Sequence, residues 1–256
     1  MSEKINSIQR TMRVLTYICY QKQGVRVSEL AKAFDMSSPA IYNYLKSLQM
    51  EGFIIKDSVS GRFRATFRVL DLASVVQGNN SLAEIAYPEM VHLSDEISAT
   101  VHLAILEGTM GICVSKVENS LAVPSITRVG MSFDLYATAL GKALLAYLPK
   151  DQVDVYLAKT PLEPYTPHTL IDKDALLADL ETTRQRGYAR DSEEHKQGLH
   201  AIGVPVMDHA SNVIAAISTP LASSVSDVEV KSMVAVMKDY SKKISRTLGQ
   251  TDVHPA

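Results

Sequence analysis

The chain has 256 residues and a formal net charge of −2, and 46% of its residues are hydrophobic and 21% charged. This length suggests one large or two modest domains, and the composition excludes a globally disordered chain. No apolar run approaches about 18 residues and the N-terminus has no apolar signal core, so we expect neither a membrane nor a secreted protein. Cys19 and Cys113 are the only cysteines, which excludes a disulfide framework and fits a cytoplasmic protein.

The small total charge averages two unlike parts of the chain. Residues 1–68 hold eleven Lys and Arg against five Asp and Glu, a balance of +6, which leaves −8 for the remainder. Such asymmetry indicates a basic module that faces a polyanion and an acidic module that faces something else. Chance scatter of charges is the alternative explanation.

Helical periodicity dominates the N-terminal part of the chain. Apolar residues at helical spacing predict short helices over about 8–19, 29–34 and 39–49. Pro39 suits the first position of the third helix, because its missing N–H is not needed there, and Ser38 can cap that helix.

A basic β-hairpin is expected after the third helix, from the alternating segments 53–56 and 62–65. Three short helices and such a hairpin make a winged helix-turn-helix, which we expect over residues 1–67. The short turn holds the third helix so that it can enter a major groove about 12 Å wide. The hairpin places Arg62 and Arg64 near phosphates or the minor groove.

The outward face of the third helix supplies most candidate DNA contacts. Asn43 is the candidate for base reading because Asn pairs bidentately with adenine, whereas Lys46 suits a phosphate. The alternative is that both are ordinary solvated helix residues; Tyr44 is expected in the core. The candidate DNA-binding residues are Ser38, Pro39, Ala40, Tyr42, Asn43, Lys46, Arg62 and Arg64.

Residues 68–80 are apolar at helical spacing and predict a helical linker that ends at Gly78-Asn79-Asn80. A capping box then opens a further helix at Ser81, which reaches about Ile97.

Strand and helix patterns alternate in the rest of the chain. We expect strands over 100–106, 111–117, 122–127, 201–207 and 213–219, and helices over 138–148, 175–186 and 226–248. Antiparallel hairpins with helices grouped between them indicate an α+β domain with a mostly antiparallel, GAF-like sheet. This domain is expected over residues 81–250, with a tail at 251–256.

Motifs in both parts of the chain resemble the IclR family of bacterial transcriptional regulators, in register over about residues 5–248. They are Ser28–Ala31, Ser37–Leu45, Glu51–Phe53, Ser60–Arg64, Arg128–Gly130, Tyr136–Ala146, Arg186–Asp191, Gly198–Val206 and Val213–Ser218. Family members often have Ser-Lys-Ser-Thr at positions 37–40 and Arg at 43. Because this chain departs there, the operator of a relative should not be carried over.

The resemblance implies a regulator of a catabolic operon, more often a repressor than an activator, that binds double-stranded operator DNA. A small carboxylate would control it, a sugar acid by first expectation and an aromatic acid by second. It further implies a homodimer through residues near 1–20 and 68–80, or a dimer of dimers, with contact to RNA polymerase as another route of control. The alternatives are helices that pack only on their own chain and an architectural DNA-binding dimer without ligand control.

The resemblance also implies an effector pocket. Backbone N–H groups of Ala139 and Leu140 would hold the carboxylate, and Asp191 would accept hydrogen bonds from ligand hydroxyls. The other expected pocket residues are Ser125, Phe133, Gln197, Leu199, Ala201 and Ser218. Family members often have Cys in place of Ala201 and a small hydroxyl residue in place of Pro220, so the ligand of a relative cannot be copied. The alternative is that these positions serve packing alone.

No enzymatic motif is present: the sequence lacks G-x-S-x-G, G-x-G-x-x-G, Walker A and H-E-x-x-H patterns. We therefore expect no enzyme and no cofactor. His102, His195 and His200 are not spaced for a compelling metal site with Asp191, and we expect no metal.

Overall fold

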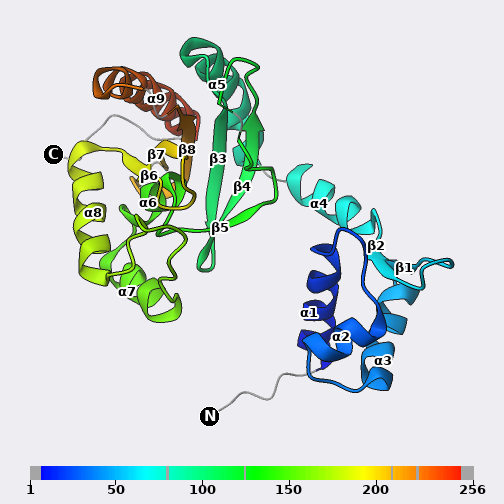
Figure 1. The fold of residues 1–256 in the computed structure, drawn as a ribbon. Helices are drawn as coiled ribbons and strands as arrows, with labels where there is room; N and C mark the ends of the chain where they lie inside the picture. The colour runs from blue at the N-terminus through cyan, green and yellow to red at the C-terminus, as the bar shows by residue number, and fades with distance from the viewer. Residues whose placement is uncertain (1–6, 79–80, 124, 209, 223–224, 249–256) are drawn as a thin grey trace. The chain divides into compact units, whose positions relative to one another are not determined.

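The computed structural model describes residues 7–78, 81–123, 125–208, 210–222 and 225–248. The chain divides into two compact units, one of residues 1–79 and one of residues 80–256 (Figure 1). Among the described residues, no helix combines the length and apolar character that crossing a bilayer requires.

The first unit is a winged helix-turn-helix followed by one more helix, as predicted. Its elements are α1 (Ser7–Cys19), α2 (Val27–Ala33), α3 (Ser38–Met50), β1 (Ile54–Lys56), β2 (Phe63–Ala65) and α4 (Arg68–Gly78). Strands β1 and β2 pair antiparallel and form the wing. Phe63 of the wing joins the core of α1–α3, and its backbone bridges to Val25, so the wing is fastened to the helices.

The start of α3 differs from the sequence-based prediction. The helix begins at Ser38, with Ser37 in the N-cap position and Pro39 in the second helical position. No side chain caps the helix, so the capping role expected of Ser38 is wrong. Pro39 is still tolerated, because the first N–H groups of a helix have no intrahelical acceptor.

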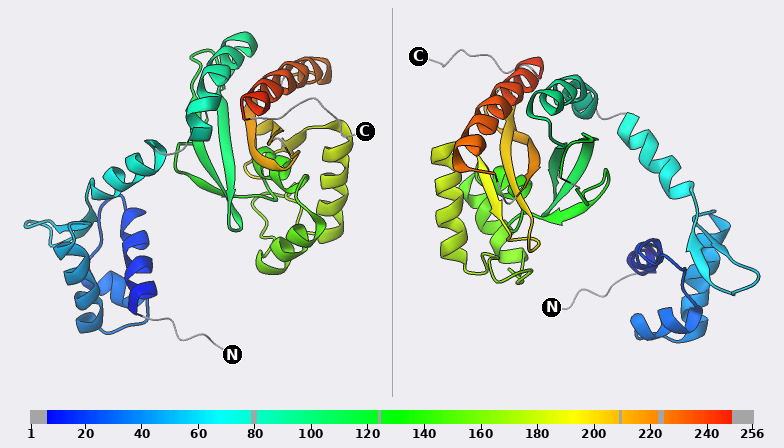
Figure 2. Two further views of the ribbon diagram at one scale, coloured as in Figure 1. Left: turned by 180° about the vertical axis from the view of Figure 1, so that it is seen from behind. Right: turned by 45° about the horizontal axis from the view of Figure 1, so that its top comes forward.

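The second unit is a six-stranded antiparallel sheet in the order β5-β4-β3-β8-β7-β6, with helices on both faces (Figures 1 and 2). Its strands are β3 (Val101–Glu107), β4 (Met110–Val117), β5 (Ser132–Asp134), β6 (Ala189–Ser192), β7 (His200–Met207) and β8 (Val213–Leu221). Its helices are α5 (Ser81–Ile97), α6 (Ala139–Leu145), α7 (Lys150–Lys159), α8 (Lys173–Arg186) and α9 (Asp227–Thr247).

Two separate apolar clusters cover the two faces of this sheet. One cluster joins α5 and α9 to β3, β7 and β8. The other joins α6, α7 and α8 to the opposite side, where Ala104 and Ala216 contribute from the strands. Alternate residues of a strand point to opposite faces, which explains how Ala216 and Ile217 serve different clusters. The predicted α+β class is confirmed.

Several predicted elements are corrected. Residues 122–123 and 125–127 are not in a strand; the edge strand that pairs with β4 is β5 instead. Helix α7 and strand β6 were not predicted. Gly78 lies inside α4, whereas Asn79 and Asn80, expected to end the linker, lie outside the described residues, as does the side chain of Ser81.

Two glycines let α6 approach the rest of its unit closely. A Cβ atom at Gly141 would overlap the backbone of Leu135, and one at Gly203 of β7 would lie 2.5 Å from the carbonyl oxygen of Ala139. Real Cβ atoms do not come this near to backbone atoms. The N-terminal turn of α6 therefore rests directly on the sheet.

We expect Gly141→Ala to lower the free energy of unfolding by at least about 1–3 kcal/mol, because the added methyl group overpacks a backbone contact that cannot yield. Alanine normally stabilises a helix interior by about 1 kcal/mol relative to glycine, so helix propensity alone predicts the opposite sign. Chemical denaturation of the two proteins decides between them. A variant at least as stable as its parent would contradict the close approach.

Candidate functional site

The candidate DNA-contacting residues of α3 lie on its exposed side. Ser38, Pro39, Tyr42, Asn43 and Lys46 are exposed, and Ala40 is half-buried. The opposite side of the helix carries its buried residues, Ile41, Leu45 and Leu48. Tyr44 is half-buried rather than fully in the core. The structure thus leaves the predicted reading face open to a partner.

Arg62 and Arg64 of the wing have different surroundings. The Arg62 guanidinium donates to the Gly24 carbonyl oxygen at 2.8 Å and forms a two-pronged ion pair with Glu29 of α2, at 3.1 and 3.2 Å. The same Glu29 carboxylate accepts the backbone N–H of Arg26 at 2.9 Å. Arg64 is exposed on β2. Arg62 therefore ties the wing to α2, while Arg64 faces solvent.

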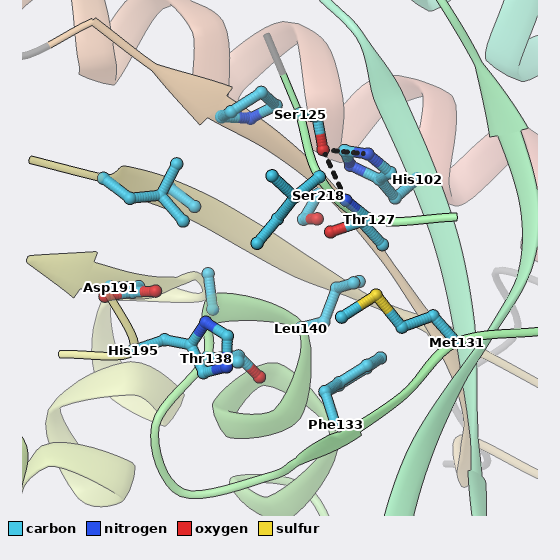
Figure 3. A pocket seen from close by; sticks show the side chains of 15 residues that line it. His102, Ser125, Thr127, Met131, Phe133, Thr138, Leu140, Asp191, His195 and Ser218 are labelled. Carbon is cyan, nitrogen blue, oxygen red and sulfur yellow. Dashed lines mark hydrogen bonds between the residues drawn. The ribbon is translucent and has the colours of Figure 1, made fainter. Parts of the chain in front are cut away.

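A cavity opens in the second unit between the sheet, the start of α6 and two loops (Figure 3). Its volume is about 70 Å³, which is room for several water molecules and hence for a small ligand. Its lining residues are His102, Ser125, Ile126, Thr127, Met131, Phe133, Thr138, Ala139, Leu140, Asp191, His195, Leu199, Ala201, Ser218 and Pro220.

This lining contains eight of the nine predicted effector residues. The exception is Gln197, which is exposed in the loop between β6 and β7 and does not line the cavity. Pro220, noted from sequence only as a departure from the family, is part of the wall. The residues that sequence reasoning missed are His102, Ile126, Thr127, Met131, Thr138 and His195.

Two rows of paired residues on one face of the sheet form the floor of the cavity. Residues two apart along a strand share a face, and cross-strand partners lie side by side. The rows run Asp191–Ala201–Pro220 across β6, β7 and β8, and Gly203–Ser218–His102 across β7, β8 and β3. Because Gly203 has no side chain, the start of α6 packs directly against β7 at this residue. The register of the sheet thus gathers residues that are far apart in sequence.

Thr138 shapes the α6 side of the cavity. Its hydroxyl accepts the N–H of Gly141 at 3.0 Å and so caps the helix. The N–H groups of Ala139 and Leu140 precede the first intrahelical acceptor, and both residues line the cavity. The predicted donor group for an anion is therefore at the cavity wall. A threonine just before an apolar run was the signal for this cap.

A hydrogen bond between Ser125 and His102 closes another side. The Ser125 hydroxyl lies 2.8 Å from His102 Nε2 and also accepts the N–H of Thr127 at 3.2 Å (Figure 3). Burial, and secondarily the charge of Lys116, lowers the pKa of His102 to about 4. Its imidazole is therefore neutral near pH 7 and offers one donor and one acceptor. This bond joins the 125–131 loop to β3.

The loop after β6 is held by a buried ion pair. Lys142 of α6 is completely buried, and its Nζ lies 2.6 and 2.8 Å from the two carboxylate oxygens of Glu194 and 3.0 Å from Asp179 of α8. The hydroxyls of Thr166 and Thr169 donate to the carbonyl oxygens of Glu193 and Glu194, both at 2.6 Å. This loop carries His195 into the cavity.

The Asp191 carboxyl is 2% exposed and accepts the N–H of Glu194 at 2.8 Å. Burial raises its pKa to about 7. No lysine or arginine is among the residues that line the cavity. Within the described part of the chain, no group of three or more His, Cys, Asp or Glu could hold a metal ion.

Comparison with protein families matches nearly the whole chain. Residues 7–58 match the IclR helix-turn-helix domain, and residues 74–246 match the C-terminal domain of the bacterial transcriptional regulator IclR. The chain belongs to the IclR family. This IclR-family protein is a DNA-binding transcriptional regulator and not an enzyme, as the sequence predicted.

Curated relatives and solved structures agree. The regulator is 32% identical to the HTH-type transcriptional regulator XynR of Escherichia coli over 96% of this chain and 98% of that protein. It is 30% identical to the transcriptional repressor AllR of the same species over 97% and 92%. The crystal structure of Thermotoga maritima IclR is 32% identical and superposes with a TM-score of 0.73, covering 96% and 100% of the two chains.

Because Arg62 and Arg64 have different surroundings, we expect their replacement by alanine to have different effects. Arg64→Ala should weaken binding to any DNA sequence and flatten the salt dependence by about one counterion, with stability unchanged. Arg62→Ala should lower the melting temperature of the free protein, because Glu29 loses its paired guanidinium and the Gly24 carbonyl oxygen loses its side-chain donor. Salt-dependent DNA titrations and thermal melts measure both. If Arg62→Ala melts like its parent and only loses salt slope, Arg62 contacts DNA instead.

Proposed function

We propose that this regulator represses a catabolic operon and that a small carboxylate in the second-unit cavity controls its affinity for operator DNA. The observation that carries the proposal is the cavity itself, which lies in the domain that matches the IclR C-terminal family and presents hydroxyls, imidazoles and helix-start amides. The repressor name of AllR, a 30% identical relative, supports the sign of control. Such a regulator would act in the cytoplasm, where its operator is.

The chemistry of the lining supports a carboxylate. The N–H groups of Ala139 and Leu140 can hold an anion, and Ser125 and Ser218 can bind further oxygens. Sugar acids are the first class, because Asp191 and the hydroxyls suit a polar ligand. Aromatic acids are the second class, and the apolar wall of Met131, Phe133, Leu140 and Leu199 favours them.

DNA recognition is proposed for the exposed side of α3. Asn43 is suited to read a base edge, and Lys46 and Arg64 to contact phosphates. Coupling between effector and operator typically amounts to about 1–3 kcal/mol, or ~5–150-fold in affinity. If the effector binds without changing operator affinity, control would instead pass through contact with RNA polymerase.

The effector proposal is tested by a thermal-shift screen with D-gluconate as a sugar acid, benzoate as an aromatic acid and pyruvate as a small keto acid. An acid at about 100-fold its dissociation constant should add roughly 2.7 kcal/mol of stability, and the same acid should release operator DNA. Ala201→Phe is the matched control, since its ring fills the cavity floor and should remove the stabilisation while DNA binding stays. Silence of the parent protein toward all three acids would favour an architectural DNA binder.

Dimerisation through the first unit is also proposed. Apolar side chains on α1 and α4 are exposed, with Met12 at 55%, Leu70 at 61% and Val75 at 58%. Apolar side chains exposed on two helices of one unit are candidates for an interface, and two reading helices on a palindromic site multiply specificity. A dimer of dimers is the larger alternative.

Met12→Glu combined with Leu70→Glu should shift the mass in solution toward one chain, because each interface would then bury unpaired carboxylates. Light scattering without DNA measures this shift. Val59→Glu is the control: Val59 is 96% exposed, but it lies on the turn of the wing and should leave the mass unchanged. A parent protein with the mass of one chain, with and without DNA, would refute dimerisation.

A further inference from the structure

The charged groups between α6, α8 and the loop after β6 balance without Asp191. Lys142 and Arg186 are the cations of this cluster, and Asp179 and Glu194 are its anions. Lys142 Nζ lies 2.6 Å from Glu194 and 3.0 Å from Asp179, and Arg186 lies 3.9 Å from Asp179. Two positive charges thus face two negative charges. Asp191, next to Glu194 and almost completely buried, is a third carboxyl without a matching cation.

Lys142, the cation that acts on Asp191, is already held by Glu194 and Asp179, and the charged neighbours of Asp191 on β6 and β7 pair with other residues. Arg190, its neighbour on β6, pairs with Asp227 at 3.0 Å, and His200 of β7 lies 3.3 Å from Glu193. No ion pair of Asp191 occurs among the described residues. A buried carboxyl in this setting favours its neutral form. The pKa of about 7, raised by burial, agrees with this charge count.

The two imidazoles of the cavity do not replace that missing cation. Burial lowers the pKa of His102 to about 4 and also lowers the pKa of His195. A carboxylate entering the cavity near pH 7 therefore meets neutral hydroxyls, imidazoles and amides. It would be repelled by an ionised Asp191, but a protonated Asp191 offers it an O–H donor, the strong type of hydrogen bond.

We propose that the effector carboxylate binds together with one proton, which Asp191 carries and donates to the ligand in a hydrogen bond. This inference rests on the proposed carboxylate effector and reverses the role expected for Asp191 from acceptor to donor. When Asp191 is ionised before binding, the proton comes from solvent. Effector release from the pocket would then be favoured by rising pH.

The test is calorimetric titration of the full-length parent protein and Asp191→Asn with pyruvate, D-gluconate and benzoate, at about pH 6 and pH 8. The parent affinity should fall about tenfold between these values, with close to one proton taken up at the higher pH, measured in two buffers of different ionisation enthalpy. Asp191→Asn keeps an N–H donor and should bind with the same affinity at both. His195→Gln should retain the pH dependence of the parent.

Parent binding that does not change with pH overturns the inference while leaving the carboxylate proposal intact. pH dependence that survives in Asp191→Asn and disappears in His195→Gln also overturns it. If Asp191→Asn does not fold, proton uptake by the parent still decides, and an uptake near zero refutes the inference. No binding of any acid at either pH contradicts the carboxylate proposal itself.

The pH dependence of the stability of the ligand-free protein tests the protonation of Asp191 independently. Between an unfolded-state value near 3.8 and a folded-state pKa of about 7, the folded chain keeps a proton that the unfolded chain has released. The parent should therefore lose stability as pH rises through this window, by about 1.4 kcal/mol per pH unit at most, and Asp191→Asn should not. A stability difference that stays flat between about pH 4.5 and 7 would show Asp191 ionised and overturn the inference.

Discussion

The buried contact between Lys142 and Glu194 is the interaction on which the second unit depends. Lys142 stands on α6, its second partner Asp179 on α8, and Glu194 in the loop that carries His195. Removing one member of a buried ion pair strands a charge and typically costs about 3–5 kcal/mol. The Lys142 ammonium group therefore joins α6, α8 and the loop after β6. Glu194 also donates its N–H to Asp191 at 2.8 Å, so the same cluster is joined to a residue that lines the cavity.

The two units differ in which surfaces they expose and which they cover. The first keeps its apolar core small and leaves Lys46, Asn43 and Arg64 exposed on a basic module. The second covers both faces of its sheet with helices, which leaves a protected interior for a small molecule. Mean charge hides this division, because a basic module and an acidic one nearly cancel. The difference between the two units becomes visible only when the charges of residues 1–68 and of the remainder are counted separately.

Sequence periodicity predicted the elements whose packing is regular. The helices of the first unit and the hairpins around β3–β4 and β7–β8 followed from apolar spacing. Periodicity failed at the sheet edge: a strand was predicted over 122–127, but β5 is the strand that pairs with β4 at this edge. The ion pair between Lys142 and Glu194 could not be predicted from periodicity either, because the two residues are distant in sequence. Eight of the nine residues that the family resemblance implied line one cavity, whereas Gln197 is exposed in its loop and does not.

Ala201 and Pro220, the two pocket positions where this chain departs from common family residues, are cross-strand partners on β7 and β8. Pro220 lies beyond the last pairing of β8 with β3, so its missing N–H removes no bond between those two strands. Adjacent residues that share one wall of a cavity do not contribute independently to binding. In the proposed effector cavity, replacements at Ala201 and Pro220 should therefore be non-additive, so the effect of a double replacement cannot be obtained by summing the two single ones.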